Sequence, residues 1–281
     1  MSTPSPYERA RLRDEYLLSQ KWAQTVNPKD IDVVLVNTSI TSPELRAIHR
    51  FLPNVTGKTV LDLGCGLGEP TVYFALRGAD VTAVDISKPM LSIVKHVSKR
   101  NRVHVTTHQA SVEDLSILGN KKYDIIYIGN LLHHVNFDKT LEEICKHIKS
   151  NGVVICWDPV AYNPFINIYR KIAHSVRSRE EHPFGAVEIQ KFRNHFGKVR
   201  VQWFWLTTMI IFVLMFLSGR NPNRERYWKA VIYEGDKWKY VYKPLEVVDK
   251  LLISVFPFLG FMCWNVLIIN THPRVVFSQA P

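Results

Sequence analysis

Residues 60–69 read VLDLGCGLGE, a short apolar run that leads directly into a glycine-rich loop. The glycines stand at every second position and are Gly64, Gly66 and Gly68. Glycine permits a tight turn and a close approach of a ligand to the backbone. A helix that starts after such a loop also offers unpaired N–H groups. The stretch predicts a ligand site behind a strand, although a glycine-rich loop on its own is also compatible with a plain turn.

A second signal is Asp85, which ends the apolar run DVTAVD at residues 80–85 and follows Gly64 by 21 residues. A carboxylate at this place accepts hydrogen bonds from the two hydroxyls of a ribose. The structural alternative is that Asp85 caps a helix that begins near Ser87. The third glycine comes one position earlier than in the nicotinamide and flavin fingerprint, which disfavours a pyrophosphate cradle.

Around this loop the chain alternates between strand-like and helix-like segments. The strand-like runs are short and nearly continuously apolar, which is typical of a parallel sheet buried on both faces. They cover residues 58–63, 80–85, 102–107, 123–128 and 152–157. Helices are expected at residues 7–24 and after Ser42, before the first strand. The sequence therefore predicts an α/β fold with a doubly wound parallel sheet.

These motifs resemble the class I S-adenosylmethionine-dependent methyltransferases, in the small-molecule and quinone-biosynthesis branch. The stretches that carry the resemblance are VLDLGCGLGE at 60–69, TAVDISKPML at 82–91, SVEDL at 111–115, YDIIYIGNLLHHV at 123–135, and Asp158-Pro159. Nucleic-acid amino-methyltransferases carry an Asn/Asp-Pro-Pro-aromatic motif where this chain has Gly129-Asn130-Leu131-Leu132. The resemblance implies S-adenosyl-L-methionine as the cofactor. It also implies a Rossmann-like, mostly parallel sheet of seven strands, the last two joined as an antiparallel hairpin.

The resemblance further implies which residues contact the cofactor. The glycines line its methionine moiety, Asp85 holds the ribose, and Ile86 packs on the adenine. Ser111 replaces the acid that the family often places against the adenine amine. The full set of expected cofactor-binding residues is Asp62, Gly64, Gly66, Gly68, Asp85, Ile86, Ser111, Val112, Asn130 and Leu131.

The methyl group on a sulfonium is already activated, so positioning an acceptor in line supplies much of the rate. An oxygen or nitrogen acceptor that loses a proton also gains from a base. The expected catalytic residues are His134, His182 and Asp158; His133, Tyr162 and His174 are further candidates. Each has a structural alternative, such as capping a helix. The four cysteines show neither Cys-x-x-Cys pairs nor nearby histidines at metal spacing, so we expect no metal site and no disulfide framework.

The 281 residues carry a formal charge of +11, and this charge is unevenly distributed. Residues 1–163 contain 19 basic and 17 acidic residues, whereas residues 164–281 contain 17 basic and 8 acidic ones. Nucleic acid, anionic lipid or an anionic substrate are the partners that such an excess favours, and a solvated surface is the plain alternative. Because the basic residues are interleaved with aliphatic runs, nucleic acid is disfavoured. The N-terminal segment has no signal-peptide run, which predicts a cytoplasmic chain.

The expected sixth and seventh strands, residues 198–206 and 262–270, are separated by an apolar and basic insertion at 207–261. We therefore expect a helical arm or lid at 1–56, a methyltransferase core at 57–206 and 262–281, and this insertion. The preferred interpretation is a monotopic element that lies in the membrane interface with its basic residues against anionic lipid. A transmembrane hairpin and simple burial against the sheet are the alternatives.

Together these features predict a membrane-associated methyltransferase that acts on a hydrophobic or amphiphilic small molecule, such as a lipid, a quinone precursor or a lipid-linked intermediate. A soluble natural-product methyltransferase whose insertion forms a closed lid is the second interpretation. A non-catalytic protein that keeps the cofactor fold and recruits partners to membranes is the third. The acceptor, the methylated atom and the oligomeric state do not follow from the sequence.

Overall fold

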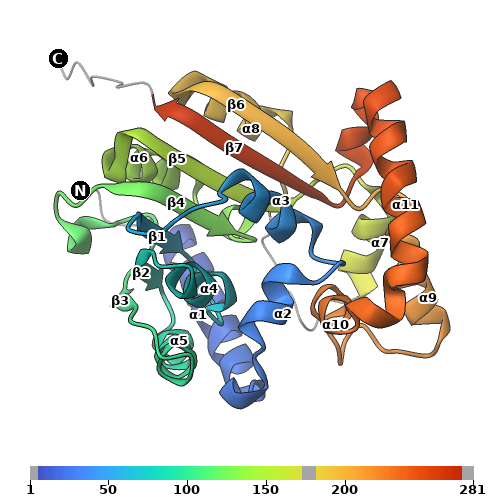
Figure 1. Cartoon of the computed structure of the whole chain (residues 1–281), viewed down its shortest axis with the longest axis horizontal. Coiled ribbons are helices and arrows are strands. Elements are labelled where there is room, and N and C mark those ends of the chain that lie inside the picture. Colours follow the sequence, from blue (N-terminus) through green and yellow to red (C-terminus); the bar gives the residue numbers. More distant parts are fainter. Residues whose placement is uncertain (1–5, 173–181, 274–281) are drawn as a thin grey trace.

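The computed structural model describes residues 6–172 and 182–273, and its centre is a seven-stranded sheet in the order β3-β2-β1-β4-β5-β7-β6. Its strands are β1 (Thr59–Leu63), β2 (Asp80–Asp85), β3 (Thr106–Gln109), β4 (Tyr123–Gly129), β5 (Ile148–Pro159), β6 (Phe196–Phe204) and β7 (Asn265–Pro273). The first five strands pair in parallel, whereas β7 is antiparallel to both β5 and β6. This confirms the predicted doubly wound, mostly parallel sheet and its terminal hairpin (Figure 1).

Helices cover both faces of the sheet. The α-helices are α1 (Pro6–Thr25), α2 (Val33–Thr38), α3 (Pro43–Phe51), α4 (Glu69–Leu76), α5 (Lys88–Arg100), α6 (Phe137–His147), α7 (Pro164–Ile172), α8 (Ala186–His195), α9 (Ile210–Leu217), α10 (Tyr227–Tyr233) and α11 (Gly235–Val255). Alternation along β1 sends Leu61 and Leu63 into the core formed with α6 and α8. Val60 packs instead on the opposite face, with α3, α4 and α5. The near-continuous apolar strands thus fill two cores.

The third strand is the one that the sequence misplaces most; the expected sixth and seventh strands, 198–206 and 262–270, are displaced by two and three residues from β6 and β7. The third strand was expected at residues 102–107, but β3 covers Thr106–Gln109 and pairs Thr106 with Thr82 of β2. Arg102 has a positive φ of 57° and the N–H of Val103 bonds the carbonyl of Ser98, so these residues finish the turn after α5. Val105 is nevertheless buried. The valines that suggested a strand therefore mark burial rather than pairing.

The predicted insertion folds into a small helical unit between β6 and β7 (Figure 1). It contains α9, α10, α11 and the 3₁₀ turn η5 (Pro257–Met262), and its core is built from α9, α10 and the aromatic residues Trp205, Tyr242 and Trp264. Among the residues that the structure describes, none of the helices combines the length and the apolar character that crossing a membrane requires. The apolar run at 203–217 is divided between β6, a turn and the eight-residue α9.

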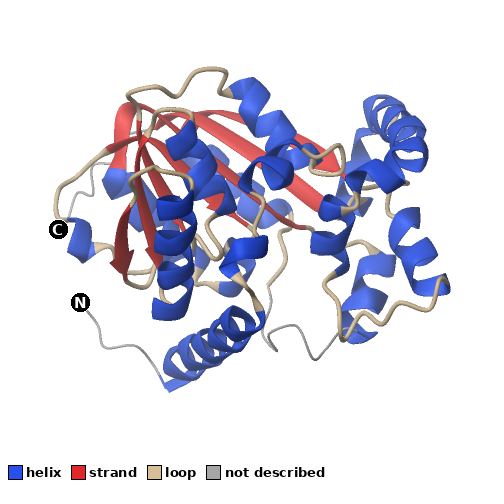
Figure 2. Ribbon diagram, turned by 60° about the horizontal axis from the view of Figure 1, so that its bottom comes forward, coloured by secondary structure: helices blue, strands red, loops and turns tan. Residues whose placement is uncertain are grey.

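The N-terminal arm forms the long helix α1, which lies on the outside of the core (Figure 2). It is held against α5 by a small apolar cluster that contains Ala23 and Ile31 on one side and Met90 and Ile93 on the other. This packing places α1 across the carboxyl ends of the parallel strands, where ligands bind in sheets of this kind.

Candidate functional site

The glycine loop after β1 adopts the left-handed backbone that its sequence favours. Gly64, Gly66 and Gly68 have φ values of 67°, 50° and 81°. A Cβ added to Gly64 would lie 2.7 Å from the side chain of Leu131, and one added to Gly68 would lie 2.8 Å from Val94. A Cβ on Gly66 would meet nothing within 4 Å, because Gly66 borders a cavity. Gly64 and Gly68 thus allow neighbouring side chains to pack closely, whereas Gly66 leaves the space beside it open.

Asp85, at the end of β2, is tied to the same loop. Its Oδ2 accepts a hydrogen bond from the Gly66 N–H at 2.9 Å, and its Oδ1 accepts one from the Ser87 N–H at 2.8 Å. Burial raises the pKa of this carboxyl above its ordinary value. Ser87 is the N-cap of α5, so the structural role proposed for Asp85 is present. A bound ribose would therefore hydrogen-bond to a carboxylate that already holds the glycine loop through the Gly66 N–H.

The carboxyl ends of β1, β2 and β4 surround a cavity of about 180 Å³. It brings together eight of the ten predicted cofactor residues, namely Gly64, Gly66, Asp85, Ile86, Ser111, Val112, Asn130 and Leu131. Of the other two, Gly68 starts α4, and Asp62 lies beneath the loop at 1% exposure. Small-molecule sites usually enclose about 300–1,000 Å³, so this cleft is partly closed over.

Asp62 has a buried acceptor that the protein does not use. Its Oδ2 accepts the hydroxyl of Thr71, whereas its Oδ1 has no hydrogen-bond partner within residues 6–172 and 182–273. Burial raises the pKa of this carboxyl from 3.8 to about 7. An orphan carboxylate oxygen under a glycine loop fits a cationic ligand group, such as the ammonium of a methionine moiety. The residues present therefore fit S-adenosylmethionine.

Helix α1 forms the lid of the cavity through side chains that sequence analysis did not single out. The buried Arg11 donates to the carboxylate of Glu113 and, at 2.5 Å, to the carbonyl of His134. Glu113 also accepts the N–H of Asn136 at 2.9 Å. The α1 residues that line the cavity are Arg11, Leu12, Glu15, Leu18, Ser19 and Trp22. The weak apolar periodicity of α1 gave little signal, because this face packs on polar partners.

Two adjacent histidines follow β4, and a carboxylate lies within hydrogen-bond distance of each. His134 lines the cavity, and its Nδ1 lies 3.0 Å from Oε1 of Glu15 on α1. Its ring lies 3.8 Å, between centroids, from the ring of His133. His133 is buried, and its Nδ1 lies 2.5 Å from Oδ1 of Asp158. The predicted base candidate His134 is thus on the cavity wall, with a partner that the sequence did not indicate.

Asp158 lies behind this wall. It is fully buried and also accepts the N–H groups of Leu132 and His133, at 3.2 and 3.3 Å. Burial raises the pKa of this carboxyl from 3.8 to about 7. Asp158 lines neither the cofactor cavity nor the cavity beside it, so any influence of Asp158 on chemistry passes through the 131–134 loop that it holds.

His182 lies apart from the cofactor cavity. It borders a neighbouring cavity of about 510 Å³ that shares only Arg11 and Val135 with the cofactor cavity. Its backbone N–H donates to the carbonyl of His133 at 2.8 Å. Tyr162 is about half exposed and belongs to neither cavity, and His174 lies outside the described residues. The structure therefore brings His134, but not His182, to the cofactor residues.

The insertion reaches the cofactor cavity, as the closed-lid interpretation of the sequence requires. Arg226 and Trp228 line it together with Trp22 of α1. The guanidinium of Arg226 lies 4.2 Å from the ring centre of Trp22, and the rings of Trp22 and Trp228 pack edge to face at 6.3 Å. Lys229 forms an ion pair with Glu69, directly after the glycine loop. Within the described part of the chain, no group of three or more His, Cys, Asp or Glu side chains is arranged to hold a metal ion.

Comparisons with known proteins agree with this site. A sequence family described as a methyltransferase domain matches residues 61–156. The ubiquinone biosynthesis O-methyltransferase of Pseudomonas syringae pv. tomato is 30% identical over 111 residues, covering 40% of this chain and 48% of that protein. The enzyme of the same name from Rickettsia akari is 32% identical over 97 residues, covering 34% and 38%. The chain thus spans about half or less of the length of these curated relatives.

Among solved structures, the N-methyltransferase NodS from Bradyrhizobium japonicum, in complex with S-adenosyl-L-homocysteine, superposes with a TM-score of 0.56. The alignment covers 93% of this chain and 100% of that one at 9% identity, which supports the fold alone. The family match, the glycine loop and the strand order agree. Residues 61–156 therefore match a methyltransferase domain within a fold typical of the class I S-adenosylmethionine-dependent methyltransferases, and the residues of the site fit S-adenosyl-L-methionine as the cofactor.

Proposed function

We propose that this protein transfers a methyl group from S-adenosylmethionine to a hydrophobic or amphiphilic small molecule at a membrane surface. The observation that carries the proposal is one cavity bordered by the glycine loop, Asp85 and His134, and roofed by both α1 and the insertion. The curated relatives are named O-methyltransferases of ubiquinone biosynthesis, which favours an oxygen acceptor on an apolar molecule.

Different residues of the site would contact different parts of the cofactor. Asp85 would accept the ribose hydroxyls, and Ile86, Ser111 and Val112 would border the adenine. Oδ1 of Asp62, which has no hydrogen-bond partner among the described residues, would accept a hydrogen bond from the ammonium of the methionine moiety. Gly66 keeps its face of the cavity clear of side-chain atoms. When bound, the cofactor supplies the activated methyl group.

The proposed base is His134, oriented by Glu15. If Nδ1 carries the proton, it donates to the Glu15 carboxylate at 3.0 Å, and Nε2 is left as a proton acceptor. The tilted contact with the His133 ring and the hydrogen bond from Arg11 to the His134 carbonyl restrain the ring and the backbone of His134. Glu15 lies on α1, so the orientation of His134 as a base would depend on α1 covering the cavity.

Apolar side chains that are exposed on the insertion support the proposal that the protein binds a membrane surface. On α11, Tyr240, Val247, Leu251 and Val255 are exposed and recur at helical spacing, so they form one stripe. Lys239, Lys243 and Lys250 follow the same helix along one side of it. Exposed apolar residues of neighbouring elements extend the surface; they are Ile210, Val213, Leu214 and Leu217 of α9, Phe165, Ile168 and Ile172 of α7, and Phe256 and Phe258. We name this set the outer apolar surface. Apolar surface with a basic border is typical of interfacial helices.

The alternative of a soluble enzyme with a closed lid also has a specific basis. The inner residues of α9, Ile211, Phe212 and Met215, are buried, and Trp228 closes the cofactor cavity. Vesicle flotation distinguishes the two: Leu251→Ser with Val255→Ser would abolish binding of an interfacial helix. The buried residues need no change, so the fold is retained.

The acceptor class is tested by incubating the protein with methyl-labelled S-adenosylmethionine and an organic-solvent extract of membranes. We expect label in the organic phase, and much less of it with His134→Gln in the same time. Label confined to aqueous products would contradict the amphiphilic acceptor. Calorimetric binding of the cofactor without any turnover would instead favour the non-catalytic recruiter.

A further inference from the structure

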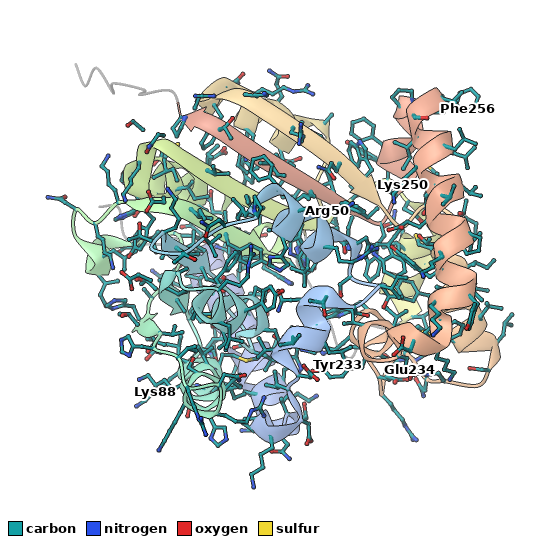
Figure 3. All side chains as sticks on the ribbon, in the orientation of Figure 1. Arg50, Lys88, Tyr233, Glu234, Lys250 and Phe256 are labelled. Atoms are coloured by element: carbon teal, nitrogen blue, oxygen red, sulfur yellow. The ribbon has the colours of Figure 1, made fainter. Side chains whose placement is uncertain are left out.

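A groove of about 710 Å³ separates α11 from α3 and from the edge strand β6, and it shares no lining residue with the cofactor cavity. Three elements contribute one exposed cation each: Arg50 from α3, Arg200 from β6 and Lys250 from α11. Figure 3 shows Arg50 and Lys250 on the two sides of the space between α3 and α11. The groove is therefore a separate feature whose rim carries positive charge.

The two acidic residues of the groove are already engaged. Glu246 is 2.6 Å from the guanidinium of Arg46, which lies outside the groove lining, and 3.1 Å from the ammonium of Lys250. Asp249 is 5% exposed. It accepts the backbone N–H groups that begin the turn before α9 and the hydroxyls of Thr207 and Thr208. The exposed charge of the groove is consequently cationic.

The floor of the groove is aromatic, formed by Phe51, Phe204, Trp205 and Tyr242. Cations over an aromatic and apolar floor suit a ligand with an anionic head and an apolar body. The groove is also continuous with the outer apolar surface. Lys250 and Ser254 line it, and Leu251 and Val255, the next residues on α11, belong to the exposed stripe. A molecule seated here would have its head in the groove and its tail beside α11.

We propose that the groove between α3, β6 and α11 binds the phosphate head group of an anionic membrane lipid, and that Arg50, Arg200 and Lys250 are its ligands. This proposal rests on the membrane association in the proposed function and adds a head-group site to it. Charge complementarity and continuity with the outer apolar surface favour a bilayer lipid over a soluble anion. Lipid bound at this edge would fix the insertion on the membrane, with the cofactor cavity on the far side of α10.

The test is flotation with vesicles of phosphatidylcholine alone and with added phosphatidylglycerol. We expect the wild-type chain to bind the anionic vesicles more tightly. Each groove cation near an anionic surface contributes about fivefold, so the triple variant Arg50→Gln, Arg200→Gln, Lys250→Gln is expected to bind on the order of a hundredfold more weakly. The matched control is Lys88→Gln, Lys95→Gln, Lys99→Gln on α5. It removes the same charge at exposed positions remote from the groove, as Figure 3 shows for Lys88.

A second measurement separates lipid from free phosphate. Trp205 lines the groove and is one of seven tryptophans, so the emission change that the triple variant removes reports on the groove. We expect a spectral shift with monomeric short-chain phosphatidylglycerol, a smaller one with glycerol phosphate, and loss of both in the triple variant. Equal spectral shifts with the two probes would show that the acyl chains add nothing to binding. Such a result would overturn the proposal that the groove binds a lipid.

Other outcomes also bear directly on the proposal. Equal losses in the groove and α5 variants would overturn it in favour of diffuse attraction, and equal wild-type binding to both vesicles would overturn it while leaving membrane association intact. Absence of binding to either vesicle would contradict the membrane part of the proposed function. Cofactor binding, measured by calorimetry, is expected to be unchanged throughout, and it tests the methyltransferase site separately.

Discussion

Oε1 of Glu15 lies 3.0 Å from Nδ1 of His134, across 119 residues of sequence. One partner belongs to the lid helix α1 and the other to the loop after β4, and both line the cofactor cavity. The contact therefore joins α1 to the loop after β4 across the cavity.

This pair leads to the first prediction. A base in the transition state contributes about 10²–10⁴-fold, so His134→Gln is expected to lower kcat by that order while leaving cofactor affinity nearly unchanged. Glu15→Gln is expected to lower kcat by about tenfold, since an amide orients the ring without stabilising its charged form. The exposed His96→Gln serves as the control. An unchanged kcat in His134→Gln would show that positioning suffices.

Gly66 gives a second prediction, because its Cβ position is open while its φ is 50°. Gly66→Ala is expected to fold with a loss of about 1 kcal/mol from the left-handed backbone and to bind S-adenosylmethionine much more weakly. Gly57→Ala is the matched control, with a φ of 70°, nothing within 4 Å of its added Cβ, and a position outside the cavity. Calorimetry and thermal unfolding of both variants provide the comparison. Equal cofactor affinities in the two variants would contradict the placement of the ligand.

The ion pair between Lys229 and Glu69 predicts that the insertion controls cofactor exchange. Removing a charged hydrogen bond costs about 1.5–3 kcal/mol, so Lys229→Met is expected to speed cofactor dissociation by about tenfold or more. Lys237→Met removes an exposed charge from the same insertion and should leave the rate unchanged. Stopped-flow fluorescence measures both. Identical rates in the two variants would mean that α10 does not restrain the cofactor.

Glu44 predicts a pH dependence of stability. Burial raises its pKa from 4.5 to about 7, so the folded state holds the proton more tightly than the unfolded chain does. Stability is therefore lost as the pH rises from about 4.5 to 7, and the loss persists above pH 7.

Glu44→Gln keeps an acceptor for the Asn265 amide at 2.7 Å and removes the buried charge. The variant is expected to be more stable at pH 8 by up to about 3 kcal/mol and to match the wild type near pH 4. Urea unfolding at both pH values measures the difference. Parallel stability curves for the two proteins would refute this assignment.

The sequence was sufficient to predict that the glycine loop and Asp85 lie beside one cavity. Backbone conformation and strand ends are local properties, so the spacing of Gly64, Gly66 and Asp85 fixed both the loop and its partner strand. The position of β3 could not be read in the same way. Val103 and Val105 have the side chains of a strand, but pairing depends on where the turn after α5 ends.

For the proposed catalytic residues, some features followed from the sequence and others only from the tertiary structure. His134 was identifiable because it follows β4, whereas its partner Glu15 lies on a helix whose polar face gave no periodic signal. His182 was placed near the substrate by its position after β5, yet it borders the adjoining cavity.

The amino-acid sequence by itself determined the doubly wound sheet, the glycine loop and the carboxylate at the end of β2, because these depend on residue type and short-range spacing. Only the tertiary structure decided that α1 and α10 meet over the cofactor cavity, and that α3, β6 and α11 enclose a cationic groove. Both sites join residues more than a hundred positions apart, and such contacts are set by packing, not by local propensity.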